Sequence, residues 1–234
     1  NLRSSGLRFG TLLIEEDKIS IYDCDPYYQG ETLKTFALTD RSGVVFQIDL
    51  TGDDWTEYVG AWGGCPEDAQ DMNTKERLNR YRDQLDSVCW TFPVDHKLDA
   101  DSLVTMIVNG EEVPLHQWAF QPVQVGGLDI ASMEANAQGA VLHTKAPMDL
   151  QELELVAGDK TYLLKRGDAA SSDGNLMNVS FYTEDTPLRA DKLTAIRVGD
   201  QEAALKGTKV SAALSPDILN QPLPSKDRAK EPNA

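Results

Sequence analysis

The chain has 234 residues, of which 22 are basic and 38 acidic, and its formal net charge is −16. This length can hold one large domain or two of ordinary size, and 41% of the residues are hydrophobic, enough to supply cores. Because the negative charge repels phosphate groups, the composition argues against nucleic-acid binding. Because no apolar run reaches about 18 residues, we expect no membrane insertion by this sequence.

Two segments near the start of the chain show the period-two alternation of apolar residues that is typical of β-strands. The first is "LRFGTLLIEEDKISIYD" (7–23). The second, "LTDRSGVVFQI" (38–48), predicts two strands separated by a turn that contains Gly43.

An aromatic segment, "DDWTEYVGAWGG" (53–64), comes next. Exposed aromatic rings on one face can bind a ligand such as a sugar, so Trp55, Tyr58 and Trp62 are candidate ligand-facing residues. The alternative is that Trp55 and Trp62 pack the following segment onto the core.

The following segment, about residues 66–88, predicts a helix. Its apolar residues recur at helical spacing, at Leu78, Tyr81, Leu85 and Val88. Asn73 and Glu76 have the spacing of a capping box, which marks a helix start. We therefore expect a helical insertion in a chain that otherwise alternates with period two.

Three cysteines are present, and two of them, Cys65 and Cys89, bracket this insertion. A Cys65–Cys89 disulfide would contribute about 3.5 kcal/mol on the chain-entropy model. The alternative is that all three thiols are reduced. Cys24 is expected to be unpaired in either case.

An eighteen-residue segment occurs twice, as "LDADSLVTMIVNGEEVPL" (98–115) and "LRADKLTAIRVGDQEAAL" (188–205), with seven identical positions. In both copies a strand leads into a two-residue turn, Asn109-Gly110 or Gly199-Asp200, and residue types of this kind favour hairpins. Met106 and its counterpart Ile196 are expected to face the core. The positions beyond the turn, among them Glu111 and Gln201, are expected to be exposed.

The similarity extends upstream of these segments. The alternating residues Val88, Trp90 and Phe92 match Met177, Val179 and Phe181, the segment 38–48 resembles 155–165, and 7–23 is expected to match 118–131. Units of about 90 residues with short strands and frequent turns are typical of β-sandwiches. We predict an all-β protein with one sandwich over 1–117, a second over 118–207, and a Pro-rich tail over 208–234 that packs on a domain.

No sequence motif for catalysis is present: HExxH, CxxC, GxSxG, P-loop and GxGxxG patterns do not occur. His96, His116 and His143 have no ligand-spaced neighbours and are expected at the surface or rim of the fold. Arg166-Gly167-Asp168 spells an adhesion tripeptide in an expected loop, with an ordinary hairpin exit as the alternative. We predict neither an enzyme nor a metal or cofactor site.

The phrases "L-x-A-D-x-L", a strand, Asn-Gly and "x-x-P-L" in the two copies resemble the Ig-like ectodomain repeats of Gram-positive membrane-anchored proteins of unknown function. Some of those proteins are similar to anti-sigma factors, with a short cytoplasmic segment, one membrane helix and an exterior of this kind. The resemblance covers the ends of both units. It implies tandem Ig-like sandwiches, and it transfers no catalytic or binding residue.

From these observations we expect a non-catalytic, extracytoplasmic domain pair of a cell-envelope protein, in sensing or protein interaction. Because the sequence begins with Asn1, we expect that a signal peptide or membrane anchor precedes it. The partner would be a protein or an envelope glycan. The alternative function is a carbohydrate-binding or adhesion module, which the aromatic segment at 53–64 would serve.

Overall fold

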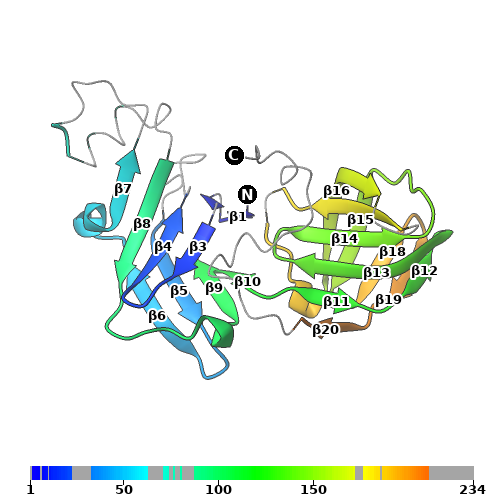
Figure 1. Ribbon diagram of the computed structural model, residues 1–234, viewed down its shortest axis with the longest axis horizontal. Coiled ribbons are helices and arrows are strands. Elements are labelled where there is room, and N and C mark those ends of the chain that lie inside the picture. The colour runs from blue at the N-terminus through cyan, green and yellow to red at the C-terminus, as the bar shows by residue number, and fades with distance from the viewer. Residues whose placement is uncertain are drawn as a thin grey trace, which may run out of the picture. The chain divides into compact units, whose positions relative to one another are not determined.

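The computed structural model describes residues 2–5, 7–9, 11–22, 33–62, 71–73, 76, 80, 87–171, 176–184 and 186–210. These residues fall into two compact units, which we call unit 1 (up to Val113) and unit 2 (from Pro114). The described elements are strands and short 3₁₀ helices, so the prediction of an all-β protein is confirmed. Figure 1 shows the strands of each unit.

Unit 1 is built from strands that form a two-stranded sheet, β1-β2, and two four-stranded sheets, β3-β4-β8-β7 and β10-β9-β5-β6. The strands are β1 (Leu2–Ser4), β2 (Leu7–Phe9), β3 (Thr11–Ile14), β4 (Lys18–Tyr22), β5 (Thr35–Thr39), β6 (Val44–Asp49), β7 (Val59–Trp62), β8 (Ser87–Pro93), β9 (Thr105–Val108) and β10 (Glu111–Pro114). The 3₁₀ helices η2 (Asp53–Tyr58) and η5 (Ala100–Ser102) connect them.

Aromatic rings join the two four-stranded sheets of unit 1. Phe36 on β5 stacks on Phe92 of β8 with ring centroids 5.5 Å apart, and Phe46 on β6 lies 6.0 Å from the same ring. Phe36, Trp90 and Phe92 are all at most 1% exposed. Facing sheets with a shared aromatic core agree with the predicted sandwich class.

In unit 2 the strands form one ten-stranded sheet, in the order β19-β18-β15-β16-β17-β14-β13-β11-β20, with β12 paired to β13. The strands are β11 (Trp118–Phe120), β12 (Val123–Val125), β13 (Leu128–Asn136), β14 (Gly139–Thr144), β15 (Glu152–Ala157), β16 (Lys160–Ser171), β17 (Met177–Tyr182), β18 (Ala195–Val198), β19 (Gln201–Ala204) and β20 (Gly207–Lys209), with the 3₁₀ helix η6 (Ala190–Lys192). The predicted tail therefore begins within β20, and its residues from 211 lie outside the described ones.

Unit 2 is a single sheet by hydrogen bonding because β16 pairs with two neighbours in turn. Its first half, up to Lys165, pairs with β15, and its second half, from Lys165, pairs with β17, with a bulge between Arg166 and Ala169. Side chains from both arms of the bent sheet, including Leu155, Val179 and Phe181, meet in one buried core.

The two units repeat the same strand pairing. Sheet β10-β9-β5-β6 of unit 1 has the same order as β19-β18-β15-β16 of unit 2. Leu38 lies opposite Met106, and Leu155 lies opposite Ile196, so the predicted match of 38–48 with 155–165 is confirmed. All four of these side chains are completely buried.

One predicted match is wrong. Residues 7–23 do not correspond to 118–131, because the pairings align 7–22 with 128–143 instead. The error arises from β11, which we took as the first strand of the repeat. Strand β11 has no counterpart among the described residues of unit 1.

Pairing within each unit fixes the corrected alignment. Leu12 pairs with Ile21 in unit 1, as Met133 pairs with Leu142 in unit 2. Ile21 then pairs with Trp90 of β8, and Leu142 with the equivalent Val179 of β17. The predicted core position of Trp90 is confirmed, since its side chain is 1% exposed.

Extra residues in unit 1 interrupt the strand that is continuous in unit 2. Strand β6 pairs with β5, as the first half of β16 pairs with β15, and β7 pairs with β8, as the second half of β16 pairs with β17. Helix η2 lies between β6 and β7. Unit 1 therefore has additional residues, 50–58, where one strand of unit 2 passes between two sets of partners, and the predicted helical insertion comes later, between β7 and β8.

The repeated turns have the backbone that their residues predict. Asn109 and Gly110 both have positive φ, 48° and 84°, as a type I′ turn requires. In the Gly199-Asp200 turn of unit 2, only Gly199 has positive φ, 57°, which fits a type II′ turn. The two "L-x-A-D-x-L" motifs contain the 3₁₀ helices η5 and η6, which the sequence did not predict.

Glu111 is half-buried and not exposed as expected, whereas Gln201 is exposed as expected. Glu111 accepts hydrogen bonds from the Ser4 hydroxyl at 2.7 Å and the Ser5 N–H at 2.5 Å, both in the β1–β2 hairpin. Gln201 accepts from the N–H of Gly126 at 3.1 Å, in the equivalent β12–β13 turn. The β9–β10 hairpin therefore bonds to the β1–β2 turn, and the β18–β19 hairpin bonds to the β12–β13 turn.

The predicted helix lies mostly outside the described residues. The capping box itself is present: the Asn73 side chain accepts from the N–H of Glu76 at 2.9 Å, and the Glu76 carboxylate accepts from the N–H of Asn73 at 3.3 Å. At the other end, Ser87 and Val88 belong to strand β8, so the predicted range of 66–88 extends too far.

Candidate functional site

The aromatic candidates come from η2 and β7. Trp55 lies 5.7 Å from the Trp90 ring, and Tyr58 lies 5.8 Å from the Phe92 ring, measured between ring centroids. Both side chains are half-buried against the core of unit 1. The backbone of Trp62 pairs with Ser87, and its side chain lies outside the described ones. A role of these rings in ligand binding stays a prediction.

Of the two candidate disulfide residues, only Cys89 is described. It is 2% exposed on β8, where its sulfur lies 3.5 Å from the Trp90 carbonyl oxygen and 3.6 Å from the Thr91 hydroxyl. Cys65 and Cys24 lie outside the described residues, so the Cys65–Cys89 bridge stays a prediction.

The Arg166-Gly167-Asp168 tripeptide does not lie in a loop after a strand. It lies at the bulge inside β16, and the Arg166 guanidinium donates to the carbonyl oxygens of Met148 and Leu150 at 2.8 and 3.3 Å. A Cβ on Gly167 would come within 2.7 Å of the Ser180 hydroxyl. The arginine therefore has a structural role, because it binds backbone carbonyls of its own unit.

The histidines differ in burial, and one prediction is wrong. His116 is 6% exposed and therefore buried, because it directly follows the inward-facing end of the repeated hairpin at Leu115. His143 on β14 is half-buried and contacts the Asn178 side chain at 2.7 Å. His96 is exposed beside Asp95. No group of three metal-ligating side chains occurs among the described residues.

An acidic hollow of about 590 Å³ lies in unit 1. Residues 14–16, at the end of β3, line one side, and residues 97–101, which lead into η5, line the other. Four of these residues are carboxylates, namely Glu15, Glu16, Asp99 and Asp101, and one is a lysine. We call this feature the acidic hollow. Its surplus of negative charge favours a cationic group.

The equivalent place in unit 2 has different contacts. There the N–H of Leu188 donates to the carbonyl oxygen of Ala137 at 2.9 Å. No such bond joins the corresponding residues 98 and 16 within the described part of unit 1. Arg189, at the position of Asp99, forms two hydrogen bonds with Asp191, at 2.9 and 2.8 Å. The two units therefore differ here: unit 1 has the acidic hollow, and unit 2 has the Leu188–Ala137 hydrogen bond and the Arg189–Asp191 ion pair at the equivalent positions.

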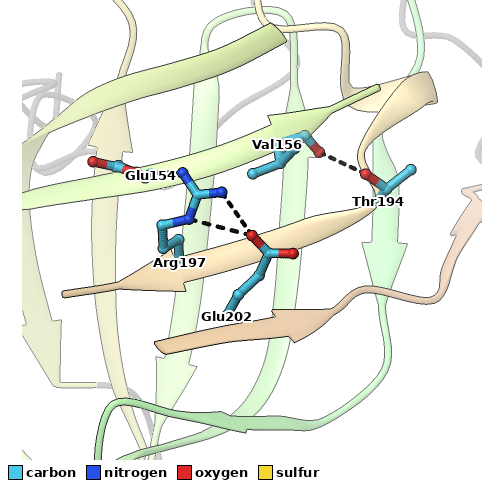
Figure 2. A network of polar contacts seen from close by, with 5 residues as sticks. All are labelled: Glu154, Val156, Thr194, Arg197 and Glu202. Carbon is cyan, nitrogen blue, oxygen red and sulfur yellow. Dashed lines mark hydrogen bonds and ion pairs between the residues drawn. The ribbon is translucent and has the colours of Figure 1, made fainter. Parts of the chain in front are cut away.

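Unit 2 carries a different charged feature on its outer face. Arg197 of β18 binds Glu154 of β15 at 3.2 Å and Glu202 of β19 at 2.7 Å, as Figure 2 shows for these neighbouring strands. Hydrogen bonds to Glu202 and then Glu154 raise the pKa of Arg197. The Thr194 hydroxyl also donates to the Val156 carbonyl oxygen at 3.3 Å.

Unit 1 has no counterpart of these Arg197 ion pairs. The strand register places Ile107 and Ala37 at the positions of Arg197 and Glu154. In unit 2, the positive charge of Arg197 on β18 is thus balanced by Glu154 on β15 and Glu202 on β19. In the acidic hollow, Glu15 forms an ion pair with Lys18 at 3.4 Å and Asp99 accepts a hydrogen bond from the N–H of Asp101 at 3.2 Å, but its lining still holds four carboxylates and one lysine.

Comparison of the chain with protein-family models, with curated proteins and with solved structures gave no significant match. Within the described residues, no helix combines the length and the apolar character that a membrane crossing requires. The resemblance to Ig-like ectodomain repeats stays a hypothesis.

Proposed function

We propose that this chain is a non-catalytic pair of tandem Ig-like β-sandwiches, the first with a helical insertion. In this proposal it belongs to the extracytoplasmic part of a membrane-anchored cell-envelope protein and acts in sensing or protein interaction. The acidic composition fits a solvated exterior location.

One observation carries the proposal, and it is the difference between equivalent places in the two units. The acidic hollow of unit 1 corresponds to a position in unit 2 where the N–H of Leu188 donates to the Ala137 carbonyl oxygen and Arg189 pairs with Asp191. A scaffold role alone does not require a hollow with a surplus of carboxylates in either copy. A partner with basic groups would supply the compensation, since complementary charge favours encounter and specificity.

The experiment compares two binding assays on the whole chain. The protein is photo-crosslinked in an envelope extract, and it is also applied to a glycan array. We expect crosslinked protein partners, and we expect that Glu16→Lys in the hollow weakens capture. Glu57→Lys is the matched control, because Glu57 is an exposed acid on η2 and the net charge changes equally.

Glycan binding that depends on Trp55, without protein capture, would contradict the proposal and support the carbohydrate-binding alternative. Equal loss of capture in Glu16→Lys and Glu57→Lys would show that only net charge matters. Turnover of an envelope substrate by the purified chain would contradict the non-catalytic part.

A further inference from the structure

The dipeptide Asn109-Gly110 occurs once in the chain, at the turn of the β9–β10 hairpin. Asparagine followed by glycine is especially prone to spontaneous deamidation, because glycine has no Cβ to shield its own backbone nitrogen. In the repeated hairpin of unit 2 the first turn residue is Gly199, which carries no side-chain amide. Of the two repeated turns, only that of unit 1 contains an asparagine.

The reaction uses only the atoms of the turn and water. The backbone nitrogen of Gly110 attacks Cγ of Asn109, so that an N–Cγ bond forms and the Cγ–Nδ2 bond breaks. The proton of the Gly110 nitrogen leaves with Nδ2 as ammonia, and a five-membered succinimide remains. Water then adds to one of its two carbonyl carbons. Opening at Cγ gives aspartate, and opening at the backbone carbonyl gives isoaspartate, in which the main chain runs through the side chain.

The backbone of the folded turn opposes ring closure. Asn109 has φ 48° and Gly110 has φ 84°, as a type I′ turn requires. In such a turn ψ of the first residue is about +30°, the mirror image of a type I turn. The succinimide forms only when the Cα–C bond has rotated until the side chain and the next nitrogen eclipse each other, which is far from this ψ. The hairpin therefore has to open before the ring can close.

Hydrogen bonds also hold the reactive side chain in place. The side-chain oxygen of Asn109 accepts from the N–H of Lys34 at 2.7 Å and from the N–H of Thr35 at 3.0 Å. The N–H of Asn109 donates to the Thr35 carbonyl oxygen at 3.0 Å, and the Ser5 hydroxyl donates to the Val108 carbonyl oxygen at 2.9 Å. Rotation of the side chain toward the next nitrogen breaks its bonds to β5 and the residue before it.

We propose that Asn109 is a modification site that deamidates when the β9–β10 hairpin opens and is protected while the hairpin is closed. Its two products have different consequences. Aspartate keeps an oxygen that accepts from the N–H groups of Lys34 and Thr35. Isoaspartate adds one backbone atom to a two-residue turn, so the register of the hairpin is lost and reclosure is opposed. The reaction needs no partner and does not depend on the proposed function.

Mass spectrometry of the whole chain tests the proposal. The protein is incubated in a mildly alkaline buffer, either folded or in urea above its unfolding midpoint, and residue 109 is quantified as asparagine, aspartate and isoaspartate. In urea we expect Asn109 to deamidate faster than Asn136 and Asn178, which precede alanine and valine. In the folded chain we expect the Asn109 rate to be at least about fivefold lower, because opening breaks its hydrogen bonds.

A substitution outside the reacting pair changes how often the hairpin opens. Glu111→Ala removes the acceptor of Ser4 and Ser5, so we expect the folded rate at Asn109 to rise on the order of fivefold. Each folded rate is divided by the rate of the same variant in urea, which removes any direct effect of residue 111 on the chemistry. Gln201→Ala is the matched control, because it removes the equivalent bond in unit 2 and should leave the ratio unchanged.

Refolding tells the two products apart. Chains deamidated in urea are returned to buffer, the aspartate and isoaspartate forms are separated, and Asn109→Asp serves as the standard for the aspartate form. We expect the isoaspartate form to unfold at a lower urea concentration than Asn109→Asp. Equal midpoints would overturn the effect on reclosure.

Two further outcomes would overturn the proposal. Equal rates at Asn109 in the folded and unfolded chains would show that the turn gives no protection. A rate at Asn109 in urea no higher than that at Asn178 would show that it is not a preferred site. If Glu111→Ala does not fold, the two rates of the unsubstituted chain still decide between protection and its absence.

Discussion

The side-chain oxygen of Asn109 accepts a hydrogen bond from the N–H of Thr35 at 3.0 Å, and it accepts another from Lys34 at 2.7 Å. One turn residue thereby ties the β9–β10 hairpin to the start of β5. Gly199 occupies the equivalent turn in unit 2 and has no side chain to form this link.

Replacing Asn109 with glycine keeps the positive φ of the turn and removes both side-chain hydrogen bonds. We expect a cost of about 1–2 kcal/mol in the free energy of unfolding, measured by urea denaturation. The reciprocal change, Gly199→Asn, should alter stability by less than about 0.5 kcal/mol, since Asn tolerates positive φ. Equal effects of the two substitutions would contradict a bonding role for Asn109.

Truncation of the inward residues of the repeated hairpins should destabilise both units. Met106 and Ile196 are completely buried, so Met106→Ala and Ile196→Ala should each cost about 2–5 kcal/mol. Asp200→Ala, at an exposed turn position, is the control and should change stability by less than about 0.5 kcal/mol. If both truncations are tolerated, the repeated segment is not core scaffolding.

Glu111 should matter more to stability than its counterpart Gln201. Glu111 accepts from both Ser4 and Ser5, whereas Gln201 accepts from Gly126 at 3.1 Å. We expect Glu111→Ala to cost about 1–3 kcal/mol, because the Ser5 N–H and Ser4 hydroxyl lose their acceptor, and Gln201→Ala to cost about 0.5–1.5 kcal/mol. Hydrogen exchange at the Ser5 amide should accelerate in Glu111→Ala, and an unchanged rate would count against the contact.

The pH dependence of the β5–β6 turn follows from Asp40. Hydrogen bonds from the Ser42 hydroxyl, then from the Ser42 N–H, lower the pKa of Asp40. Because the folded pKa lies below the ordinary value, the stabilisation is present above that value and is lost as pH falls through the lowered pKa. An NMR titration of the carboxyl should show this, and Ser42→Ala should raise the pKa. A titration unchanged in Ser42→Ala would contradict the assignment.

The cysteine prediction can be tested by counting thiols. Because Cys89 is buried, labelling has to be done on the protein unfolded without reductant. We expect one labelled thiol, that of Cys24, and a lower Tm after reduction. Three labelled thiols would rule out the Cys65–Cys89 bridge.

Local patterns predicted the repeated parts of the fold well. Alternation at 38–48 and 155–165, with turns at Asn109-Gly110 and Gly199-Asp200, identified equivalent sheets because strand period and turn chemistry act over a few residues. The capping box of Asn73 and Glu76 was visible for the same reason.

Features that depend on distant pairing were missed. The segment 118–131 alternates as 7–23 does, and only the pairing of Met133 with Leu142 shows which strand is equivalent. The acidic hollow was also missed, although its carboxylates are visible in the sequence. It joins residues near 15 with residues near 99, and no local pattern links the two segments.

Strand β16 passes unbroken from one set of partners to the other, whereas in unit 1 residues 50–58, which include η2, separate β6 from β7 at the same crossing. The crossing is therefore a point where the scaffold accepts foreign sequence, since the entropic cost of a longer connection grows only slowly with length. The bulge between Arg166 and Ala169 is the corresponding graft site in unit 2. A peptide inserted there would have to preserve the contacts of Arg166 with Met148 and Leu150 and the close approach of Gly167 to Ser180.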